Sequence, residues 1–416
     1  MSLTLTFHGS VSHLSDAELD ALTAGANVFF GRRWLRMLDA VDLTALVRGE
    51  VSLRYAVVSE QGVPVALCPF FITRSRSIHP HYSLEKFFFT GWKADLERLN
   101  PSSSSWSGLA VAVADVYRRL AWLSGAGADS AVVAASPLSL RGGVLCAQQP
   151  APAAARARRM IVEGLRELAA SEQCPLYFYG VAEEDAALRE ALTEASFQEL
   201  FLFYDNVIDV PGERLEDYLG QFKSDARRLL KKEMAQARSD GVRFERLSRL
   251  GEMGDQLERF YEVTYSQYGK EHFHNPAWFW AALERHVSPE AEAVVAMKGA
   301  EPVGFSLLLH KQEELWFYRV GRAETGASTS ALYFNLAFYE PMRRAYQLGA
   351  RRLWLGPGGY ETKRRRGARR HAISGFLWIP RRWSRTLLRP YLSLFSRLSR
   401  AQVEGDPRNA RTGRAR

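Results

Sequence analysis

The chain has 416 residues, of which 47% are hydrophobic and 12% aromatic, so it can bury a sizeable core in two or three domains. No run approaches the roughly eighteen apolar residues of a membrane-spanning helix, and the N-terminus lacks the pattern of a secretory signal. The three cysteines are scattered and form no CxxC motif, so we expect no disulfide framework and no zinc site. We expect no other metal ligands either. These features together indicate a cytoplasmic protein.

Positive charge is concentrated at one end of the chain. The net charge is +9, but the segment 361–416 contains 16 Lys and Arg residues against three acids, so the preceding residues are slightly acidic overall. A local excess of this size is suited to holding a polyanion or an anionic membrane surface. A solvated surface run is the competing interpretation.

The first half of the chain alternates predicted strands and helices. Two strands separated by the turn Glu60-Gln61-Gly62 predict a hairpin, and an amphipathic pattern predicts a long helix after the Pro/Ala-rich segment 149–155. The expected strands are Tyr55–Val58, Pro64–Phe71, Pro175–Tyr179 and Phe201–Val210, and the expected helices are Ala151–Ala170 and Glu183–Glu194. A Ser-rich loop is expected over Asn100–Ser107.

The second half repeats a similar order of elements. Helices are expected over Glu252–Tyr268 and Ala331–Leu348, and strands over Ala291–Met297, Val303–Leu309, Glu314–Val320 and Arg352–Leu355. Three strands, a helix and a closing strand follow the order of the acetyltransferase-like (GNAT) core. Such an order points to a fold and does not by itself establish a function.

A basic helix is expected between the two halves, over Phe222–Ala237. Its apolar residues recur at helical spacing and should face a core; they are Phe222, Ala226, Leu229, Leu230 and Met234. Lys223, Arg227 and Lys231 are four residues apart and should form one ridge. Like charges at this spacing repel by a few tenths of a kcal/mol per pair, so the ridge either binds an anion or is a solvated face.

Several segments of the second half resemble FemAB-like aminoacyltransferases. The resemblance covers about Leu215–Ala368 and is carried by FKSDARRLLKKE, FYEVTYSQYG, PAWFW, EPVGFSLLLHKQEELWFYRVG and LGPGGYETKRRRG. The first half is similar only in element order, and the tail after Ile379 is not similar. The resemblance implies two GNAT-like domains that form one catalyst, with an aminoacyl-tRNA donor and an amine acceptor, and no cofactor.

The resemblance also implies site residues. Lys363 matches the lysine after the family's Gly-rich turn and is expected beside the terminal phosphates or the developing oxyanion. Tyr318 is expected to hydrogen-bond the substrate, on the assumption that Tyr318 and Arg319 face opposite sides of a strand. The other substrate-binding candidates are Tyr261, Trp278, His310, Arg319 and Glu361, and the tRNA-binding candidates are Lys223, Arg227, Lys231, Arg364, Arg365, Arg366, Arg369 and Arg370. His371 is a further titratable group expected near the cleft.

An acyl-CoA donor is the alternative. Acetyltransferases of this fold bind the donor's pyrophosphate on backbone amides of a Gly-rich turn that leads into a helix. The corresponding stretch here, Arg322–Leu332, contains Gly326 as its only glycine and is one residue too long. Ser328, Thr329 and Ser330 can equally cap the following helix.

The C-terminal segment reads as a basic amphipathic helix. Between Phe376 and Arg400 apolar residues recur at helical spacing beside several arginines, and Pro390 is expected to kink the helix or to start a second one. Such a helix suits an RNA backbone and equally a membrane surface. The residues from 401 to 416 are expected to be disordered.

The sequence therefore predicts an α/β (α+β) protein with two GNAT-like domains, each a mixed, mostly antiparallel sheet flanked by helices. The predicted bounds are 1–210, 211–378 for the catalytic domain, and 379–416 for the basic tail. We expect transfer of an aminoacyl group from tRNA to the amine of a natural-product or cell-wall precursor, by a monomer or dimer. The alternatives are an acyl-CoA-dependent N-acyltransferase and a non-catalytic RNA- or membrane-binding protein on the same scaffold.

Overall fold

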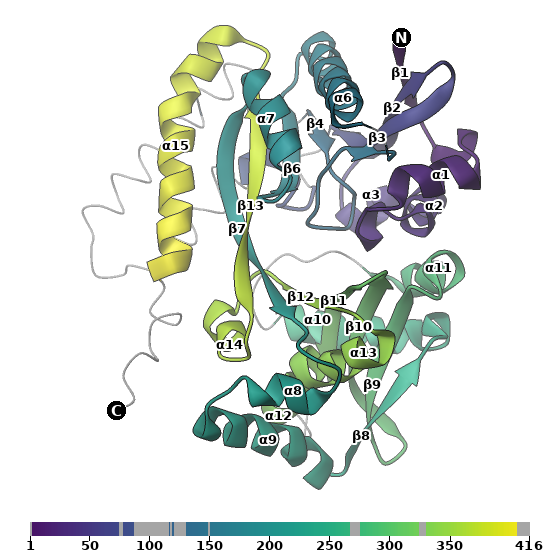
Figure 1. Ribbon diagram of the computed structural model, residues 1–416, viewed down its shortest axis with the longest axis vertical. Helices are drawn as coiled ribbons and strands as arrows, with labels where there is room; N and C mark the ends of the chain where they lie inside the picture. Colours follow the sequence, from purple (N-terminus) through teal and green to yellow (C-terminus); the bar gives the residue numbers. More distant parts are fainter. Residues whose placement is uncertain are drawn as a thin grey trace. The chain divides into compact units, whose positions relative to one another are not determined.

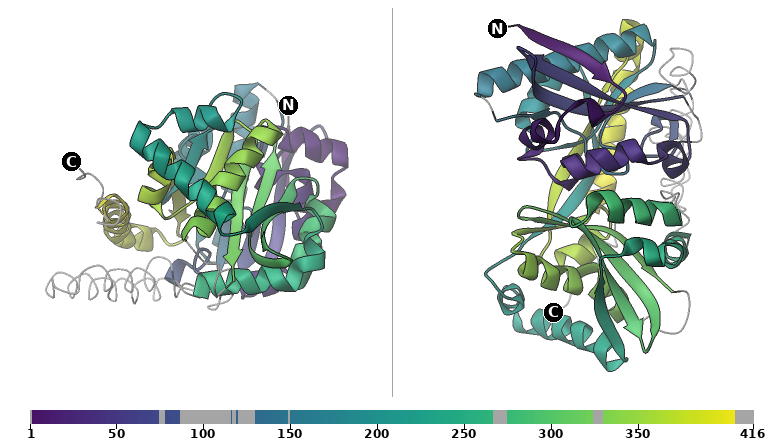
Figure 2. Two further views of the ribbon diagram at one scale, coloured as in Figure 1. Left: turned by 90° about the horizontal axis from the view of Figure 1, so that it is seen from below. Right: turned by 90° about the vertical axis from the view of Figure 1, so that its right-hand side faces the viewer.

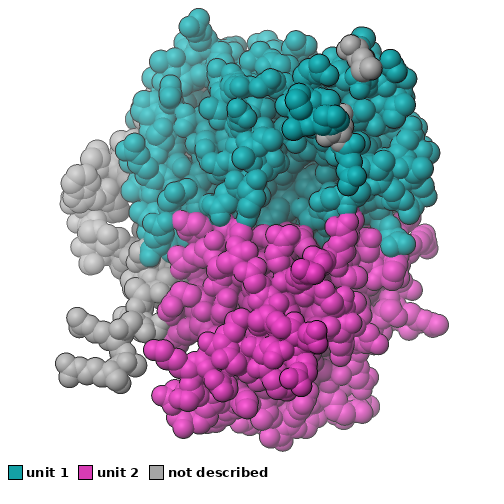
Figure 3. Space-filling view, viewed as in Figure 1, with its two compact units in different colours: residues 1–203, 372–406 teal, residues 204–371, 407–416 magenta. Residues whose placement is uncertain are grey.

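The chain divides into two compact units. The computed structural model describes residues 2–74, 78–86, 116, 119, 130–148, 150–266, 275–323 and 330–405. Among the described residues, unit 1 comprises those within 1–203 and 372–405, and unit 2 comprises those within 204–371 (Figure 3). The boundaries fall inside strands β7 (Gln198–Asp209) and β13 (Arg369–Trp378), and not at the predicted positions 210/211 and 378/379. Sequence patterns place boundaries in loops, whereas these two strands each run from one unit into the other.

Unit 1 is a mixed sheet covered by helices. Its elements are β1 (Leu3–His8), α1 (Asp16–Thr23), α2 (Arg32–Ala40), α3 (Leu43–Val47), β2 (Val51–Glu60), β3 (Val63–Thr73), β4 (Ala131–Ala134), β5 (Leu145–Cys146), α6 (Ala151–Ser171), β6 (Leu176–Ala182), α7 (Ala186–Glu194) and α15 (Arg382–Gly405), with the unit 1 portions of β7 and β13. The strand order is β1-β2-β3-β4-β6-β13, with β5 beside β3, and β4 and β6 are the parallel pair. Helix α6 packs its apolar face on this sheet (Figure 1).

Unit 2 repeats the mixed-sheet plan. Its elements are α8 (Leu215–Gly220), α9 (Ser224–Ser239), β8 (Val242–Leu247), α10 (Gly254–Ser266), α11 (Ala277–Val287), β9 (Ala291–Lys298), β10 (Glu301–Lys311), β11 (Glu314–Arg322), α12 (Ser330–Phe334), a π-helix (Asn335–Tyr339), α13 (Glu340–Leu348), β12 (Arg352–Gly356) and α14 (Tyr360–Arg364). The strand order is β7-β12-β11-β10-β9-β8, and β11 and β12 are the parallel pair.

Helices cover both faces of the unit 2 sheet (Figure 2). Leu308 packs in a core with residues of α9, the π-helix and α13. Phe305, three residues away on β10 and therefore on the opposite face, meets Trp280 of α11 with ring centroids 5.3 Å apart. Both faces are therefore buried, which explains the nearly continuous apolar runs of β9 and β10.

A bulge interrupts the pairing of β10 with β11. The register passes from Leu307–Arg319 to Leu308–Phe317, which leaves Tyr318 as the extra residue on β11. A bulge breaks the strict alternation of side chains across a strand. The expectation that Tyr318 and Arg319 face opposite sides depended on that alternation, and it is wrong for this reason.

The predicted fold class is confirmed, and most predicted elements are present. The hairpin strands are longer than expected, as β2 and β3, and the predicted helix Ala331–Leu348 is divided into α12, the π-helix and α13. Leu229 of α9 is 52% exposed, so its predicted place in a core is wrong. The loop expected at Asn100–Ser107 and much of the stretch Arg322–Leu332 lie outside the described residues.

The C-terminal segment forms one helix, α15, which belongs to unit 1 and contains Pro390 within its length. Residues 401–405, expected to be disordered, are its last turn, and the following residues lie outside the described part. None of the helices in the described part of the chain combines the length and apolarity that a membrane crossing requires.

Candidate functional site

The Gly-rich turn after β12 has a backbone that only glycine adopts easily. Gly356, Gly358 and Gly359 have φ values of +75°, +73° and +56°, in the left-handed region that L side chains avoid. A methyl group added at Gly356 or Gly358 would meet no heavy atom within 4 Å. The space beside these two residues is therefore open, and a ligand can approach the backbone closely there.

Lys363 fixes this turn from the buried side. The first residues of α14 follow the turn, and the lysine side chain returns beneath it, so that Nζ donates to the carbonyl oxygens of Leu355 (2.8 Å), Gly356 (2.9 Å) and Pro357 (2.9 Å). An ammonium group has three protons, and here all three are used. Burial lowers the pKa of Lys363 to about 8, while Asp205 opposes the shift. Lys363 was predicted beside a reacting ester, and the structure places it under the turn.

Two polar residues of β7 complete this cluster. Asn206 is completely buried, and its Nδ2 donates to the Gly356 carbonyl (2.7 Å), which therefore accepts from both Asn206 and Lys363. The Asn206 backbone amide donates to the Asp205 carboxylate (2.7 Å). Neither residue was predicted as part of the site. The available signal was an adjacent Asp-Asn pair inside the apolar strand FLFYDNVIDV.

The arginines after the turn differ in burial and in their partners. The Glu361 carboxylate is buried and accepts from Arg364 (2.8 Å) and Arg365 (3.1 Å), whose side chains remain largely exposed. Arg369 pairs with Asp209 (2.6 Å), which holds the pKa of that carboxyl below its usual value, and also contacts His371. The remaining members, Arg366 and Arg370, are engaged with neighbouring aromatic rings.

Arg366 is buried, and its side chain contacts other residues of unit 2. Its guanidinium donates to Glu233 (2.7 Å) and Tyr339 (3.2 Å) and lies 3.9 Å from the ring centroid of Phe334. Tyr339 also donates to Glu233, and burial raises the pKa of its hydroxyl. Arg366 was predicted to contact tRNA phosphates, but a guanidinium enclosed in this way cannot reach a surface ligand. We therefore correct that assignment.

Arg370 is half-buried and lies over two tyrosine rings. Its guanidinium is 5.0 Å from the Tyr360 ring centroid and 5.7 Å from that of Tyr204, a cation–π arrangement at the beginning of β13. The hydroxyl of Tyr360 accepts from the Tyr204 backbone amide (3.3 Å). These contacts connect the basic run to the strand that carries Asp205 and Asn206.

Tyr318, Arg319 and Tyr261 form a second polar group, on β11 and α10. The Arg319 guanidinium lies 3.9 Å from the centroid of the Tyr318 ring and 5.6 Å from that of Tyr261, and it donates to the Tyr318 hydroxyl (3.1 Å). Burial raises the pKa of Tyr318 to about 12, with Arg319 opposing the shift. Tyr318 is therefore neutral at physiological pH and can donate a hydrogen bond. The bulge brings these predicted residues together.

The remaining predicted residues are dispersed. Trp278 is 40% exposed on α11, and His310 is half-buried at the end of β10, where burial lowers its pKa. Lys223, just before α9, and Lys231 are exposed, whereas Arg227 is partly buried and donates to the Phe222 carbonyl (2.9 Å). The ridge is thus less regular than predicted, because Lys223 precedes the helix with extended backbone.

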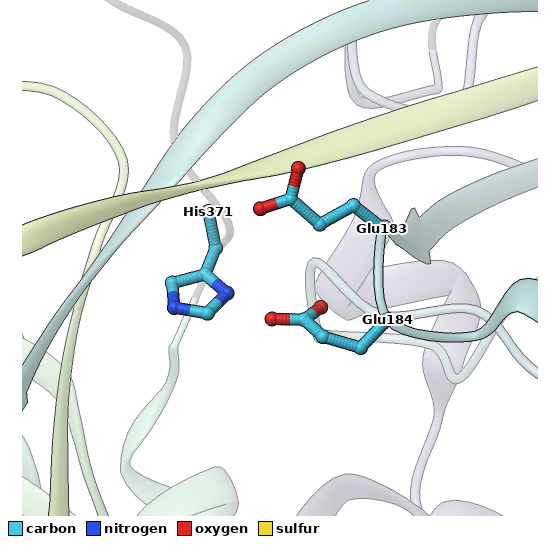
Figure 4. Close-up of side chains that lie close together, drawn as sticks. All are labelled: Glu183, Glu184 and His371. Atoms are coloured by element: carbon cyan, nitrogen blue, oxygen red, sulfur yellow. The ribbon is translucent and has the colours of Figure 1, made fainter.

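His371 packs against Trp354, with ring centroids 5.3 Å apart, near the point where β13 leaves unit 2. Figure 4 draws it with Glu183 and Glu184, which follow β6; the Glu183 backbone amide donates to the Ala372 carbonyl (3.1 Å). Both glutamates are exposed. Exposed acidic groups are common without a metal, and we assign none.

Comparison with known proteins places this geometry in context. Residues 131–406 match the model of the FemAB-like family, described as peptidoglycan biosynthesis/recognition. No curated protein matches the chain significantly. The fold is similar to the crystal structure of FemX, with a TM-score of 0.57 and 10% identity over 94% of this chain and 100% of that one.

Two further solved structures share the fold. One is the C-terminal domain of a protein described as a lysylphosphatidylglycerol synthetase from Agrobacterium fabrum (TM-score 0.53, 12% identity, 94% of this chain and 98% of that one). The other is L-PGS from Bacillus licheniformis (TM-score 0.52, 12% identity, 92% and 97%). At these identities the likeness concerns the fold.

Proposed function

The chain belongs to the FemAB-like family, and from this premise we propose that it is an aminoacyltransferase that moves an aminoacyl group from aminoacyl-tRNA to an amine. We propose a cell-wall precursor or another small molecule as the acceptor. Membership of this family supports the kind of reaction, which is transfer of an aminoacyl group. The identity of the donor as aminoacyl-tRNA is a further part of the proposal. The similar structures include proteins named for lysylphosphatidylglycerol synthesis, which is consistent with an aminoacyl donor.

The observation that carries the proposal is the Gly-rich turn. Its backbone is open beside Gly356 and Gly358 and is held from the buried side by Lys363 and Asn206. The largely exposed Arg364 and Arg365 lie at the end of α14, the short helix that follows the turn. An open, rigid backbone next to arginines suits the 3′ end of a nucleic acid, whose phosphates attract arginine and whose terminal ribose needs close approach.

The proposed reaction needs positioning more than a nucleophile. The acceptor nitrogen attacks the ester carbonyl, the C–O bond to the tRNA ribose breaks, and the proton lost by nitrogen goes to the departing ribose oxygen. Developing charge on the carbonyl oxygen requires hydrogen-bond donors fixed in advance. We propose that backbone amides of the turn supply these donors and that Tyr318 and Arg319 bind the substrate. Lys363 then acts as a positioning residue, because its protons are already shared among three carbonyls.

The test is a transfer assay with purified full-length protein, charged tRNA labelled in the amino acid, and a panel of peptidoglycan precursors and other amines. Label should appear in an acceptor, and acetyl-CoA should neither serve as a donor nor bind with micromolar affinity in calorimetry. Transfer from acetyl-CoA, with none from any charged tRNA, would replace this proposal with the acyl-CoA alternative.

A further inference from the structure

Helix α15 presents an apolar stripe to solvent. Its buried face is occupied by Leu388, Tyr391, Leu392 and Phe395. Along one edge of this face, Trp383, Leu387 and Leu394 are 52%, 36% and 46% exposed, and Pro390 is exposed between them. These four positions recur at i, i+4, i+7 and i+11, so they form one line along the helix. Large apolar side chains gathered in this way on one solvent face indicate an interaction surface.

Arginines border this stripe. Arg382, Arg389 and Arg397 are exposed and recur near whole-turn spacings, so they lie on one side of the apolar line. Glu404, in the last turn, is the single acid in the helix sequence. The face therefore combines an apolar line with a row of fixed positive charges.

The helix is held in this orientation by unit 1 itself. The Ser396 hydroxyl accepts from the Phe201 backbone amide (2.8 Å), and the Arg400 guanidinium lies 4.9 Å from the Phe201 ring centroid. Near the other end, the Arg385 guanidinium lies 5.3 Å from the ring centroid of Trp378 (Figure 1 shows α15 beside β7 and β13). The outward face is therefore fixed by packing.

We propose that this face of α15 docks on an anionic membrane surface, with Trp383, Leu387 and Leu394 entering the headgroup region and the arginines contacting acidic headgroups. Amphipathic helices that bind in this way have Trp and Leu on one side and basic residues beside them. An RNA backbone would account for the arginines, but it leaves the exposed Trp and Leu unexplained. A second copy of the chain would cover the stripe, but a two-fold contact through this face would bring both arginine rows into the interface.

Vesicle flotation of the full-length protein tests this proposal. The protein should float with phosphatidylcholine vesicles that contain phosphatidylglycerol, and weakly or not at all with pure phosphatidylcholine. The triple variant Arg382→Gln/Arg389→Gln/Arg397→Gln should lose about fivefold in partitioning for each arginine, the ratio that corresponds to about 1 kcal/mol per basic residue near an anionic surface. Trp383→Ser/Leu387→Ser/Leu394→Ser should lose at least as much binding to the vesicles that contain phosphatidylglycerol.

The matched control is Arg243→Gln/Arg246→Gln/Arg249→Gln, which removes three exposed arginines from the β8 region of unit 2 and should float like the wild type. All variants should melt like the wild type, because the changed side chains are exposed. Absence of flotation at low salt, or flotation that neither α15 variant weakens, would overturn the proposal. A charge variant that loses tRNA binding but keeps vesicle binding would overturn it in favour of RNA. The flotation assay contains no tRNA, so its result is independent of the proposed transfer activity.

Discussion

Lys363 is a buried ammonium whose protons are shared among three backbone carbonyls, and burial opposes its charge. Asn206 donates to one of the same carbonyls. The turn that they support contains three glycines in left-handed conformations. At the scale of residues, the candidate site is thus a left-handed backbone that requires glycine and is held by two buried donors.

Lys363 should make stability depend on pH. Its pKa in the folded protein is about 8 against an ordinary value of 10.5, so between these values the unfolded chain binds a proton that the folded chain has released. The free energy of unfolding should therefore rise across this window, by up to about 3 kcal/mol. Urea unfolding at pH 7 and pH 10 should show this rise relative to Lys363→Met. If the free energy of unfolding of the two proteins depends on pH in the same way, titration of Lys363 does not contribute to the change in stability.

The glycines of the turn should separate stability from activity. Gly356→Ala and Gly358→Ala create no clash but place alanine in a left-handed conformation, at a cost of about 1–2 kcal/mol each. Gly349→Ala, at the end of α13, has φ +66° and equally open space, and is the matched control. All three should lose similar thermal stability, but only the turn variants should lose aminoacyl transfer. Equal activity in all three would exclude the turn from substrate binding.

At the scale of elements, Arg366, which follows α14, contacts α9 through Glu233, the π-helix through Tyr339 and α12 through Phe334. Asn335, at the start of the π-helix, donates to the Glu233 carbonyl (2.9 Å). One buried guanidinium thereby contacts three elements of unit 2. Its burial explains why an arginine in the middle of a basic run is inaccessible to a ligand.

Removal of Arg366 should destabilise unit 2 strongly. Arg366→Ala leaves Glu233 without its buried partner, which typically costs about 3–5 kcal/mol. Arg364→Ala removes a largely exposed arginine from the buried Glu361 carboxylate, which keeps Arg365 as a partner, so this change should cost at most about 1 kcal/mol. Chemical unfolding of both variants measures the difference. Similar losses in the two variants would contradict the structural role assigned to Arg366.

The basic residues of α9 are testable as phosphate-binding groups. Changing Lys223, Arg227 and Lys231 to Gln should weaken tRNA binding and reduce the slope of log affinity against log salt by roughly 0.7–0.9 for each phosphate that is no longer neutralised. Lys223 and Lys231 are exposed, so folding should change little; Arg227 also donates to the Phe222 carbonyl and should be changed singly as well. If the salt dependence of tRNA binding is the same in the triple variant as in the wild type, these residues do not bind phosphates and form a solvated helix face.

At the scale of the whole molecule, the chain is not divided in simple sequence order. Unit 1 recruits residues 372–405 from the end of the chain, and α15 covers part of it with four large buried side chains. The C-terminal segment is therefore part of the folded structure of the first half. A FemAB-like protein of this kind cannot be separated into its units by cutting at one position.

Truncation after Ile379 should consequently prevent unit 1 from folding stably. Burial of Leu388, Tyr391, Leu392 and Phe395 contributes about 1.5–3 kcal/mol each, which together is comparable to the whole stability of a typical domain. The truncated protein should express as insoluble material or melt well below the full chain, whereas Trp383→Ala should melt like the wild type. A truncated protein with an unchanged melting curve would show that α15 is dispensable.

The class of fold, the order of most elements and the Gly-rich turn can be predicted from the sequence, because these depend on local periodicity and on conformations that only glycine adopts easily. The sequence also identifies the amphipathic character of the C-terminal helix. Which charges are buried depends on tertiary contacts. Arg366 and Arg364 are indistinguishable in the run KRRR, yet one pairs with Glu233 from a distant helix and the other stays near solvent. The roles of Asp205, Asn206 and Tyr318 likewise depend on strand neighbours and on a bulge, which are contacts between segments far apart in sequence that local patterns do not encode.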